Sequence, residues 1–280
     1  MEAYIIKGYR SAVAKANKGG FKNYRSDDLA VEVIKKLIQA VPEIDPKQVD
    51  DVIVGCANPE GEQGLQIGRL ISARALGKEV AGITINRYCA SGLESIAQAV
   101  GKIKAGFGHI YIAGGTESMS MIPMTGYKLA PSYQANMDNI NYHVSMGHTA
   151  EAVANKYMIT RDAADEFSFN SHTKAAAAID SGTFKEQIVP IKIEEVYVED
   201  GKRKTKSHTV DIDEGIRRDT TIEGLSKLRA VFKKGGVVTA GNSSQTSDGA
   251  AFTLVVSETI VKELKLEPIA RLISCAVGGV

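Results

Sequence analysis

The chain has 280 residues, 44% of them hydrophobic, and a net charge of +1 from 34 basic and 33 acidic side chains. This length supports a large core and more than one domain. The balanced charge argues against a nucleic-acid binder held by electrostatics, although it does not exclude a local basic patch. No apolar run approaches the roughly 20 residues that span a bilayer, and residues 1–7 predict a first strand rather than a secretion signal.

Three cysteines, Cys56, Cys89 and Cys275, lie far apart and form no CxxC pair. Their number and spacing therefore indicate neither a disulfide framework nor a zinc site. A reducing cytoplasm fits this cysteine usage best, so we expect a cytoplasmic protein.

Strands and helices alternate in the first part of the chain. The apolar pattern predicts strands at 4–9, 49–57, 80–86 and 109–113, and helices at 26–42, 65–77 and 91–105. Ser26 is placed to cap the first of these helices. Strands and helices of this length that alternate predict parallel βαβ units with right-handed crossovers.

The pattern changes after residue 116, and a strand of similar strength returns only at 188–198. Helices are expected at 149–157, from Thr160 to about 180, and at 222–232. We interpret this stretch as an inserted subdomain over the sheet, of the kind that covers an active site. A loop rich in glycine and small hydroxyl residues follows at 235–249, and then a strand at 252–256, a helix capped by Ser257 and a strand at 269–276.

Cys89 lies where a strand, predicted to be buried, turns into a helix with Leu93, Ile96, Ala97, Val100 and Ile103 on one face. Free backbone N–H groups at a helix start favour negative charge, so a thiol at such a position ionises more easily than one in solution. The thiolate is the nucleophilic form of cysteine. The hypothesis is a cysteine nucleophile on a strand-to-helix elbow; the alternative is a small buried apolar residue, as most free cysteines are.

Four stretches together resemble the signatures of one enzyme family. They are NRYCASGL at 86–93, GGTESMS at 114–120, SMGHTAE at 145–151 and VTAGNSSQTSDGAA at 238–251. Each resembles a thiolase motif, and their order and spacing match those of thiolases over essentially all of the chain. Thiolases are acyltransferases that make or break a carbon–carbon bond between acyl-CoA thioesters.

The resemblance implies a thiolase-like α/β fold: a mixed sheet built from βαβ units, covered by helices, with an inserted helical loop domain. The implied domains are 1–117 with 237–265 as the N-terminal domain, 118–236 as the CoA-binding insertion, and 266–280 as the first strand of a truncated C-terminal domain. Cys89 is then acylated by a 3-ketoacyl-CoA or acetyl-CoA, and the acyl group passes to CoA or to a second acetyl-CoA. Acyl-CoA and CoA are the implied partners. The resemblance also implies a homodimer or tetramer, and it implies no metal or redox cofactor.

Three residues match positions that contact coenzyme A in the family. Ser244 matches a contact of the pantetheine arm, Met146 an apolar neighbour of that arm, and Arg217 an arginine near the nucleotide end. Arginine suits phosphate and adenine because it is planar and permanently charged. The alternatives are a loop turn for Ser244, a core methionine for Met146 and a solvated surface arginine for Arg217.

The chain also departs from the family. Complete thiolases carry an Asn-Glu-Ala-Phe segment, a Gly-His-Pro segment whose histidine activates the nucleophile, and a Cys-x-Gly segment; none of these occurs in the 280 residues, and Cys275 lacks the following glycine. A nucleophile without its base loses several powers of ten in rate. His148 is the best-placed local substitute, but a structural or exposed histidine is the favoured interpretation. The basic run 202–206 is interpreted as a solvated turn, in preference to a site that attracts the CoA phosphates.

An α/β-hydrolase elbow needs glycine two residues before and after the nucleophile, whereas Arg87 and Ser91 stand there. A ketosynthase shares the fold type, but the long insertion and its CoA-type motifs favour a thiolase. The remaining alternative is a non-catalytic acyl-CoA-binding or subunit-like truncated thiolase.

Overall fold

The computed structural model describes residues 1–279. They form two compact units. Unit 1 comprises Met1–Tyr127, Glu186–Glu214 and the described residues from Thr246 onward; unit 2 comprises Lys128–Lys185 and Gly215–Gln245. A compact unit is a set of residues in mutual contact and need not coincide with a family domain, so the predicted domain limits stay a prediction. None of the described helices is both long and apolar enough to cross a bilayer.

Unit 1 is built on a six-stranded mixed sheet. Its main strands lie in the order β1 (Ala3–Arg10), β8 (Ser247–Ser257), β5 (Ile110–Ser118), β3 (Asp51–Gly55) and β4 (Ala81–Ile85), and the short β2 (Ala14–Lys15) pairs with β8. As predicted, β3 is parallel to both β4 and β5. The sheet is mixed because β8 runs antiparallel to β5 and β1. The predicted α/β class with a mixed sheet is confirmed.

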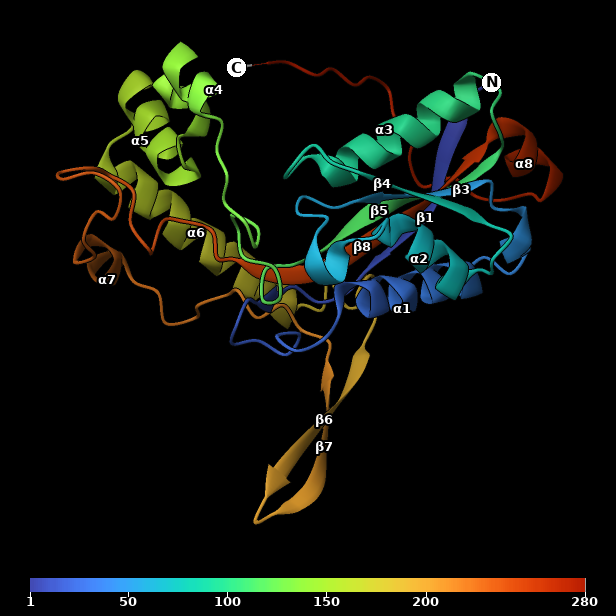
Figure 1. Cartoon of the computed structure of the whole chain (residues 1–280), viewed down its shortest axis with the longest axis horizontal. Coiled ribbons are helices and arrows are strands. Elements are labelled where there is room, and N and C mark those ends of the chain that lie inside the picture. The colour runs from blue at the N-terminus through green and yellow to red at the C-terminus, as the bar shows by residue number, and fades with distance from the viewer. Residues whose placement is uncertain (280) are drawn as a thin grey trace. The chain divides into compact units, whose positions relative to one another are not determined.

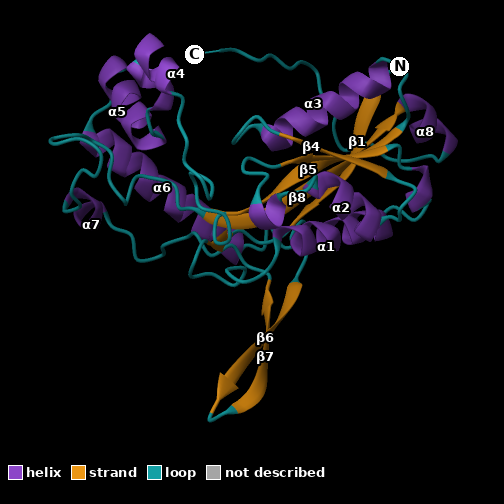
Figure 2. Ribbon diagram, viewed as in Figure 1, coloured by secondary structure: helices purple, strands orange, loops and turns teal. Residues whose placement is uncertain are grey.

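Helices cover both faces of this sheet (Figures 1 and 2). Helices α1 (Ser26–Gln39) and α2 (Ile67–Ala75) lie on one face and α3 (Ser91–Lys104) on the other. Two short 3-10 helices, η1 (Pro46–Gln48) and η2 (Gly61–Gln63), and the terminal α8 (Glu258–Glu263) complete the unit. The prediction that Ser26 caps α1 is wrong, because Ser26 is the first helical residue and Arg25 occupies the cap position.

The core follows from strand alternation, which sends successive side chains to opposite faces. Under α3, buried residues of the strands meet one face of the helix: Ile53, Tyr111, Ala113 and Val255 against Ala99, Val100 and Ile103. The neighbouring strand positions Val52, Val54, Ile112 and Leu254 are also fully buried. They face the side of α1 and α2, so the sheet is covered twice, as the apolar runs of its central strands require.

A two-stranded antiparallel ribbon, β6 (Ile191–Glu199) with β7 (Lys202–Val210), also belongs to unit 1 and projects from its sheet (Figures 1 and 2). Asp200 and Gly201 form its turn, both with positive φ, which is the conformation that an Asp-Gly hairpin turn favours. The basic run 202–206 therefore lies in a strand, and the predicted charged turn is wrong. The correct signal was the Asp-Gly pair just before it.

Unit 2 is helical. It contains α4 (Tyr133–Asp138), η3 (Ile140–His143), α5 (Met146–Lys156), α6 (Arg161–Asp180) and α7 (Ile222–Ser226). Thr160 caps α6 as predicted, because its hydroxyl accepts a hydrogen bond from the Ala163 amide at 3.2 Å. Helix α7 is shorter than the predicted 222–232, since the Leu225 and Leu228 carbonyls turn to the Arg161 side chain.

The strand predicted at 269–276 is not formed in the described chain. The segment makes an isolated bridge, in which Ile5 donates to the Ala270 carbonyl at 2.9 Å and accepts from the Ile269 amide at 2.9 Å. Strand β1 has its other edge paired with β8. One bridge fixes too few residues for a ladder, so the apolar run alone was an insufficient signal.

Candidate active site

Cys89 lies on a sharp connection between the end of β4 and the start of α3, as predicted. Its burial differs from the prediction, because Cys89 is exposed and β4 is only partly covered. The reason is the strand order: β4 is the edge of the sheet. An apolar strand pattern does not distinguish an edge strand from a central one. The exposure leaves the thiol accessible to a substrate.

Two polar side chains hold the elbow, which we define as residues 86–91. Asn86 Oδ1 accepts from the Tyr88 amide at 2.8 Å. Ser91 Oγ accepts from the Arg87 amide at 2.8 Å and donates to the Tyr88 carbonyl at 2.6 Å. Tyr88 itself has φ +45°, a left-handed conformation that is costly for a bulky residue. These hydrogen bonds stabilise the strained turn immediately before Cys89.

Gly55 brings the elbow onto the central strand β3. A Cβ atom at this position would lie 2.6 Å from the Ser91 carbonyl carbon and 2.7 Å from its Cβ. Only glycine permits so close an approach of the α3 start to the strand. The position of the elbow is therefore set by the sheet as well as by the local turn.

A polar brace links the ends of three parallel strands. Asn86 Nδ2, after β4, donates to the Ala57 carbonyl at 2.8 Å, and the Ala57 amide, after β3, donates to Glu117 Oε2 in β5 at 2.6 Å. Buried Gln63 completes it by donating to Glu117 Oε1 at 2.5 Å and accepting from the Ser118 amide at 2.6 Å. We call these groups the carboxyl-end brace, because it runs along the edge where parallel strands end and where α/β proteins bind their ligands.

Cys56 lies inside this brace and is chemically unlike Cys89. It is buried, accepts a contact from Gln63 Nε2 at 3.3 Å, and lies 3.9 Å from Glu117 Oε1. Burial, followed by the charge of Glu117, raises the pKa of the Cys56 thiol to about 12. A thiol that stays protonated is a poor nucleophile. Of these two cysteines, Cys89 is the one suited to attack a carbonyl.

The three residues predicted to contact coenzyme A all lie in unit 2, whereas Cys89 lies in unit 1. Met146 is the first residue of α5 and is 68% exposed, so it is not the core methionine of the alternative interpretation. Ser244 is exposed in the loop after residue 238, and its hydroxyl donates to the Gln245 carbonyl at 3.1 Å. Arg217 is exposed, and its amide donates to His172 Nδ1 at 3.3 Å. Their roles toward CoA stay predictions.

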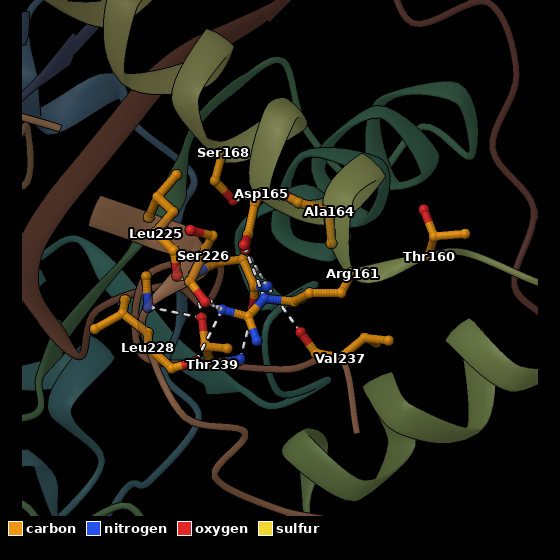
Figure 3. A network of polar contacts seen from close by, with 12 residues as sticks. Thr160, Arg161, Ala164, Asp165, Ser168, Leu225, Ser226, Leu228, Val237 and Thr239 are labelled. Carbon is orange, nitrogen blue, oxygen red and sulfur yellow. Dashed lines mark hydrogen bonds and ion pairs between the residues drawn. The ribbon is translucent and has the colours of Figure 1, made fainter. Parts of the chain in front are cut away.

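A charged network fixes the loop that carries Ser244 (Figure 3). Arg161 Nε pairs with Asp165 at 2.8 Å, and its Nη2 donates to the Leu225 and Leu228 carbonyls at 2.7 and 2.9 Å. Asp165 is buried and accepts from Asn242 Nδ2 at 2.9 Å. Asn242 in turn donates to the Val237 carbonyl at 2.8 Å and accepts from the Thr239 amide at 2.7 Å. We call Arg161, Asp165 and Asn242 the Arg161 network.

A second buried carboxylate supports the same loop. Glu151 accepts from the amides of Val237 and Val238 at 3.1 and 2.9 Å. It also lines an open pocket of about 270 Å³, together with His148, Ala152, Asn155, Phe232 and Lys233. Gly147 allows the start of α5 to approach the Phe232 ring, since a Cβ there would lie 2.3 Å from ring atoms. The residue next to Met146 is thus packed closely, while Met146 itself stays exposed.

His148 has structural partners. Its Nδ1 lies 2.8 Å from Ser145 Oγ, and its ring meets Phe232 edge-on with centroids 5.8 Å apart. His148 is also exposed, so it agrees with the favoured interpretation of a structural or exposed histidine.

Asn86, Glu117 and Asp165 hold the elbow, the loop after β3 and the loop that carries Ser244, and the sequence motifs did not identify them in this role. Asn86 had a usable signal, because asparagine often hydrogen-bonds the backbone two residues ahead in a turn. Glu117 and Asp165 had none. Their partners lie 60 and 77 residues away in the sequence.

Comparison with known proteins gives a consistent result. The family profile "Thiolase, N-terminal domain" matches residues 3–259. The chain is 45% identical to the 3-ketoacyl-CoA thiolase of Bacillus subtilis (strain 168) over 281 aligned residues, covering 100% of this chain and 72% of that relative. It is 39% identical to the 3-ketoacyl-CoA thiolase of Saccharophagus degradans, covering 100% of this chain and 70% of that relative.

A solved structure agrees with these matches. The crystal structure of the Bacillus anthracis acetyl-CoA acetyltransferase superposes with a TM-score of 0.83 at 34% identity, covering 96% of this chain and 69% of that protein. The sheet, the elbow and the family match point to one assignment: the chain belongs to the thiolase family of acyltransferases.

Proposed function

We propose that Cys89 is the residue that accepts the acyl group in the thiolase reaction. The observation that carries this proposal is its exposed position on a rigid strand-to-helix elbow, at the carboxyl ends of the parallel strands. Cys56 is buried and its thiol resists ionisation. Cys275 lies outside the helices and strands of the chain.

The proposed chemistry is covalent acyl transfer. Cys89 Sγ attacks the keto carbonyl of a 3-ketoacyl-CoA, a sulfur–carbon bond forms and the Cα–Cβ bond of the substrate breaks. Acetyl-CoA leaves as its enolate and takes a proton, and the sulfur of free CoA then displaces Cys89 from the acyl-enzyme. Splitting one difficult step into two easier ones is the benefit of a covalent nucleophile. The names of the two relatives support a 3-ketoacyl-CoA as the substrate class.

Met146, Ser244 and Arg217 are proposed to contact coenzyme A. Their exposure supports the proposal, because a ligand contact must be accessible. Arg218, the neighbour of Arg217, forms a two-bond pair with Asp180 at 2.8 and 2.9 Å, whereas Arg217 makes no ion pair with a described residue. An arginine without a carboxylate partner suits the phosphates of CoA. Arg217→Ala should weaken CoA binding measured by calorimetry, while Arg218→Ala should not.

Self-association through unit 1 and a cytoplasmic location are also proposed. Strand β4 pairs with no further strand on its outer edge within the described sheet, where its Thr84 amide donates to Gln66 Oε1 at 2.6 Å, and Ile83 in β4 is 37% exposed. Such an edge favours pairing with another chain. Three free thiols fit a reducing compartment. Light scattering of the purified protein should give at least a dimer, and a monomer at micromolar concentration would contradict the first proposal.

Covalent capture tests the function directly. The protein is incubated with acetyl-CoA, and its intact mass should rise by one acetyl group that peptide mapping places on Cys89. The 280 residues contain no Gly-His-Pro segment, so the reaction is expected to be several powers of ten slower than base-assisted catalysis and is followed over hours. Cys89→Ser should abolish the gain and Cys275→Ser should preserve it. CoA binding without acetylation would instead favour a non-catalytic acyl-CoA-binding protein.

A further inference from the structure

The side chain of Asn86 connects the elbow to the loop after β3. Membership of the thiolase family does not by itself explain this connection. Its Oδ1 accepts from the Tyr88 amide and its Nδ2 donates to the Ala57 carbonyl, both at 2.8 Å. The first contact closes a turn within the elbow. The second connects that turn to the loop after β3. That loop is in turn held by Glu117 of β5, whose Oε2 accepts a hydrogen bond from the Ala57 amide at 2.6 Å. Among the side chains of the described elbow, only that of Asn86 hydrogen-bonds the loop after β3.

Tyr88 shows why this link is needed. Its φ of +45° is unusual for a bulky residue, and its side chain is 74% exposed. Exposed tyrosine gains little from burial that could offset the strained backbone. The turn must therefore be held by hydrogen bonds, and Tyr88 directly precedes Cys89 in the chain. A change of the Tyr88 dihedral angles would move the Cys89 backbone.

We propose that Asn86 is a positioning residue for acyl transfer: its two hydrogen bonds together hold residue 88 in the left-handed conformation and thereby fix the position of Cys89. The inference rests on the proposed role of Cys89 as the acyl acceptor. Asn86 itself touches no reacting atom and acts through the backbone. A displacement of about 1 Å at a reacting group costs on the order of 100-fold in rate, so a positioning role has a large measurable effect.

Three variants test the proposal. Asn86→Ala removes both hydrogen bonds and should lower the rate of Cys89 acetylation at saturating acetyl-CoA by on the order of 10- to 100-fold, with little change in the acetyl-CoA concentration that gives half the maximal rate. Tyr88→Gly places at residue 88 an amino acid that adopts positive φ without cost. The double variant Asn86→Ala/Tyr88→Gly should therefore recover most of the lost rate. A general gain in stability could not explain this recovery, because Tyr88→Gly removes the contacts of the tyrosine side chain and adds none.

A matched control exists in unit 2. Asn139 Oδ1 accepts from the Asn141 amide at 2.9 Å, which is the same local turn away from the elbow. Asn139→Ala should leave acetylation unchanged. Hydrogen exchange of residues 86–91 gives a second readout, and Asn86→Ala should accelerate it while Asn139→Ala does not.

The outcomes separate the two proposals. Wild-type protein without acetylation at Cys89 would refute the proposed function, and the exchange measurement would still decide whether Asn86 holds the elbow. The inference would be overturned if Asn86→Ala had the same Cys89 acetylation rate and the same hydrogen-exchange rates at residues 86–91 as the wild-type protein. Loss of rate in Asn86→Ala without recovery in the double variant would also overturn it, because the effect would then not pass through residue 88.

Discussion

Two polar networks hold loops in this protein, and they are built on different supports. In unit 1, the carboxyl-end brace uses backbone amides, two side-chain amides and one carboxylate, and it rests on strands that already fix each other. In unit 2, the Arg161 network pairs a buried carboxylate with a guanidinium and reaches a loop and the end of a short helix. The sheet supplies rigidity in unit 1, so the brace only sets a fine position. In unit 2 the network itself supplies the rigidity.

The largest expected effect follows from breaking the Arg161 network. Arg161→Met removes the charge partner of buried Asp165 and the donors to the Leu225 and Leu228 carbonyls. A buried charge left without its partner costs about 3 kcal/mol of folding free energy or more. Urea unfolding monitored in unit 2 measures this loss. Arg218→Met breaks only an exposed ion pair and should cost less than about 1 kcal/mol; equal losses in the two variants would refute the distinction.

The elbow gives the next largest effect, through the contact between strand and helix. Gly55→Ala inserts a Cβ 2.6 Å from the backbone of Ser91 and should destabilise the protein by about 2 kcal/mol, while also slowing Cys89 acetylation. Gly92→Ala is the matched control, because it lies in α3 and its added Cβ meets no atom within 4 Å. Alanine is the better helix former, so this variant should gain about 0.5 kcal/mol. Thermal unfolding compares the two, and a stable, fully reactive Gly55→Ala protein would show that the sheet does not set the elbow.

The smallest effect concerns the thiol within the brace. Burial and the Glu117 charge raise the pKa of Cys56 to about 12, whereas a thiol in an unfolded chain has a pKa of about 8.5. A raised pKa contributes stability below the unfolded value and loses it as pH rises toward the folded value. Between about pH 8 and pH 10, the free energy of unfolding should therefore fall by on the order of 1 kcal/mol more in the wild type than in Cys56→Ala. Parallel pH curves for the two proteins would contradict this assignment.

The first half of the fold could be predicted because its signals are local. Apolar runs and helical periodicity located β3, α2, β4, α3 and β5, and parallel pairing followed from their alternation. The edge position of β4 could not be predicted, since strand order depends on contacts between distant segments. This is why Cys89 was correctly placed on an elbow and wrongly placed in a buried environment.

The candidate site shows the same limit. The motif at 86–93 identified Cys89 as the candidate nucleophile. The left-handed conformation of Tyr88, which directly precedes it, is consistent with the predicted sharp elbow. Of the contacts that hold the elbow, the local turn from Asn86 to the Tyr88 amide had a signal in the sequence. The others were not predictable, because Asn86 also bonds a carbonyl 29 residues away and Ala57 bonds a carboxylate 60 residues away. The strand predicted at 188–198 corresponds to β6, but its partner β7 was missed for a different reason. A run of lysine and arginine has little strand preference, and the pairing of β7 with β6 follows from the turn at Asp200 and Gly201.

That ribbon has a consequence for how the protein tolerates change. Most side chains between Glu194 and Ser207 are exposed, so the outer part of the ribbon adds little to the core of unit 1. An isolated two-stranded ribbon is at best marginally stable in water, and doubling the length of a loop costs only about 0.6 kcal/mol in closure entropy. Insertions, tags or a protease-sensitive sequence placed at Gly201 should leave the sheet intact. The tip of the ribbon is therefore a position where the chain length can change at little cost to the fold.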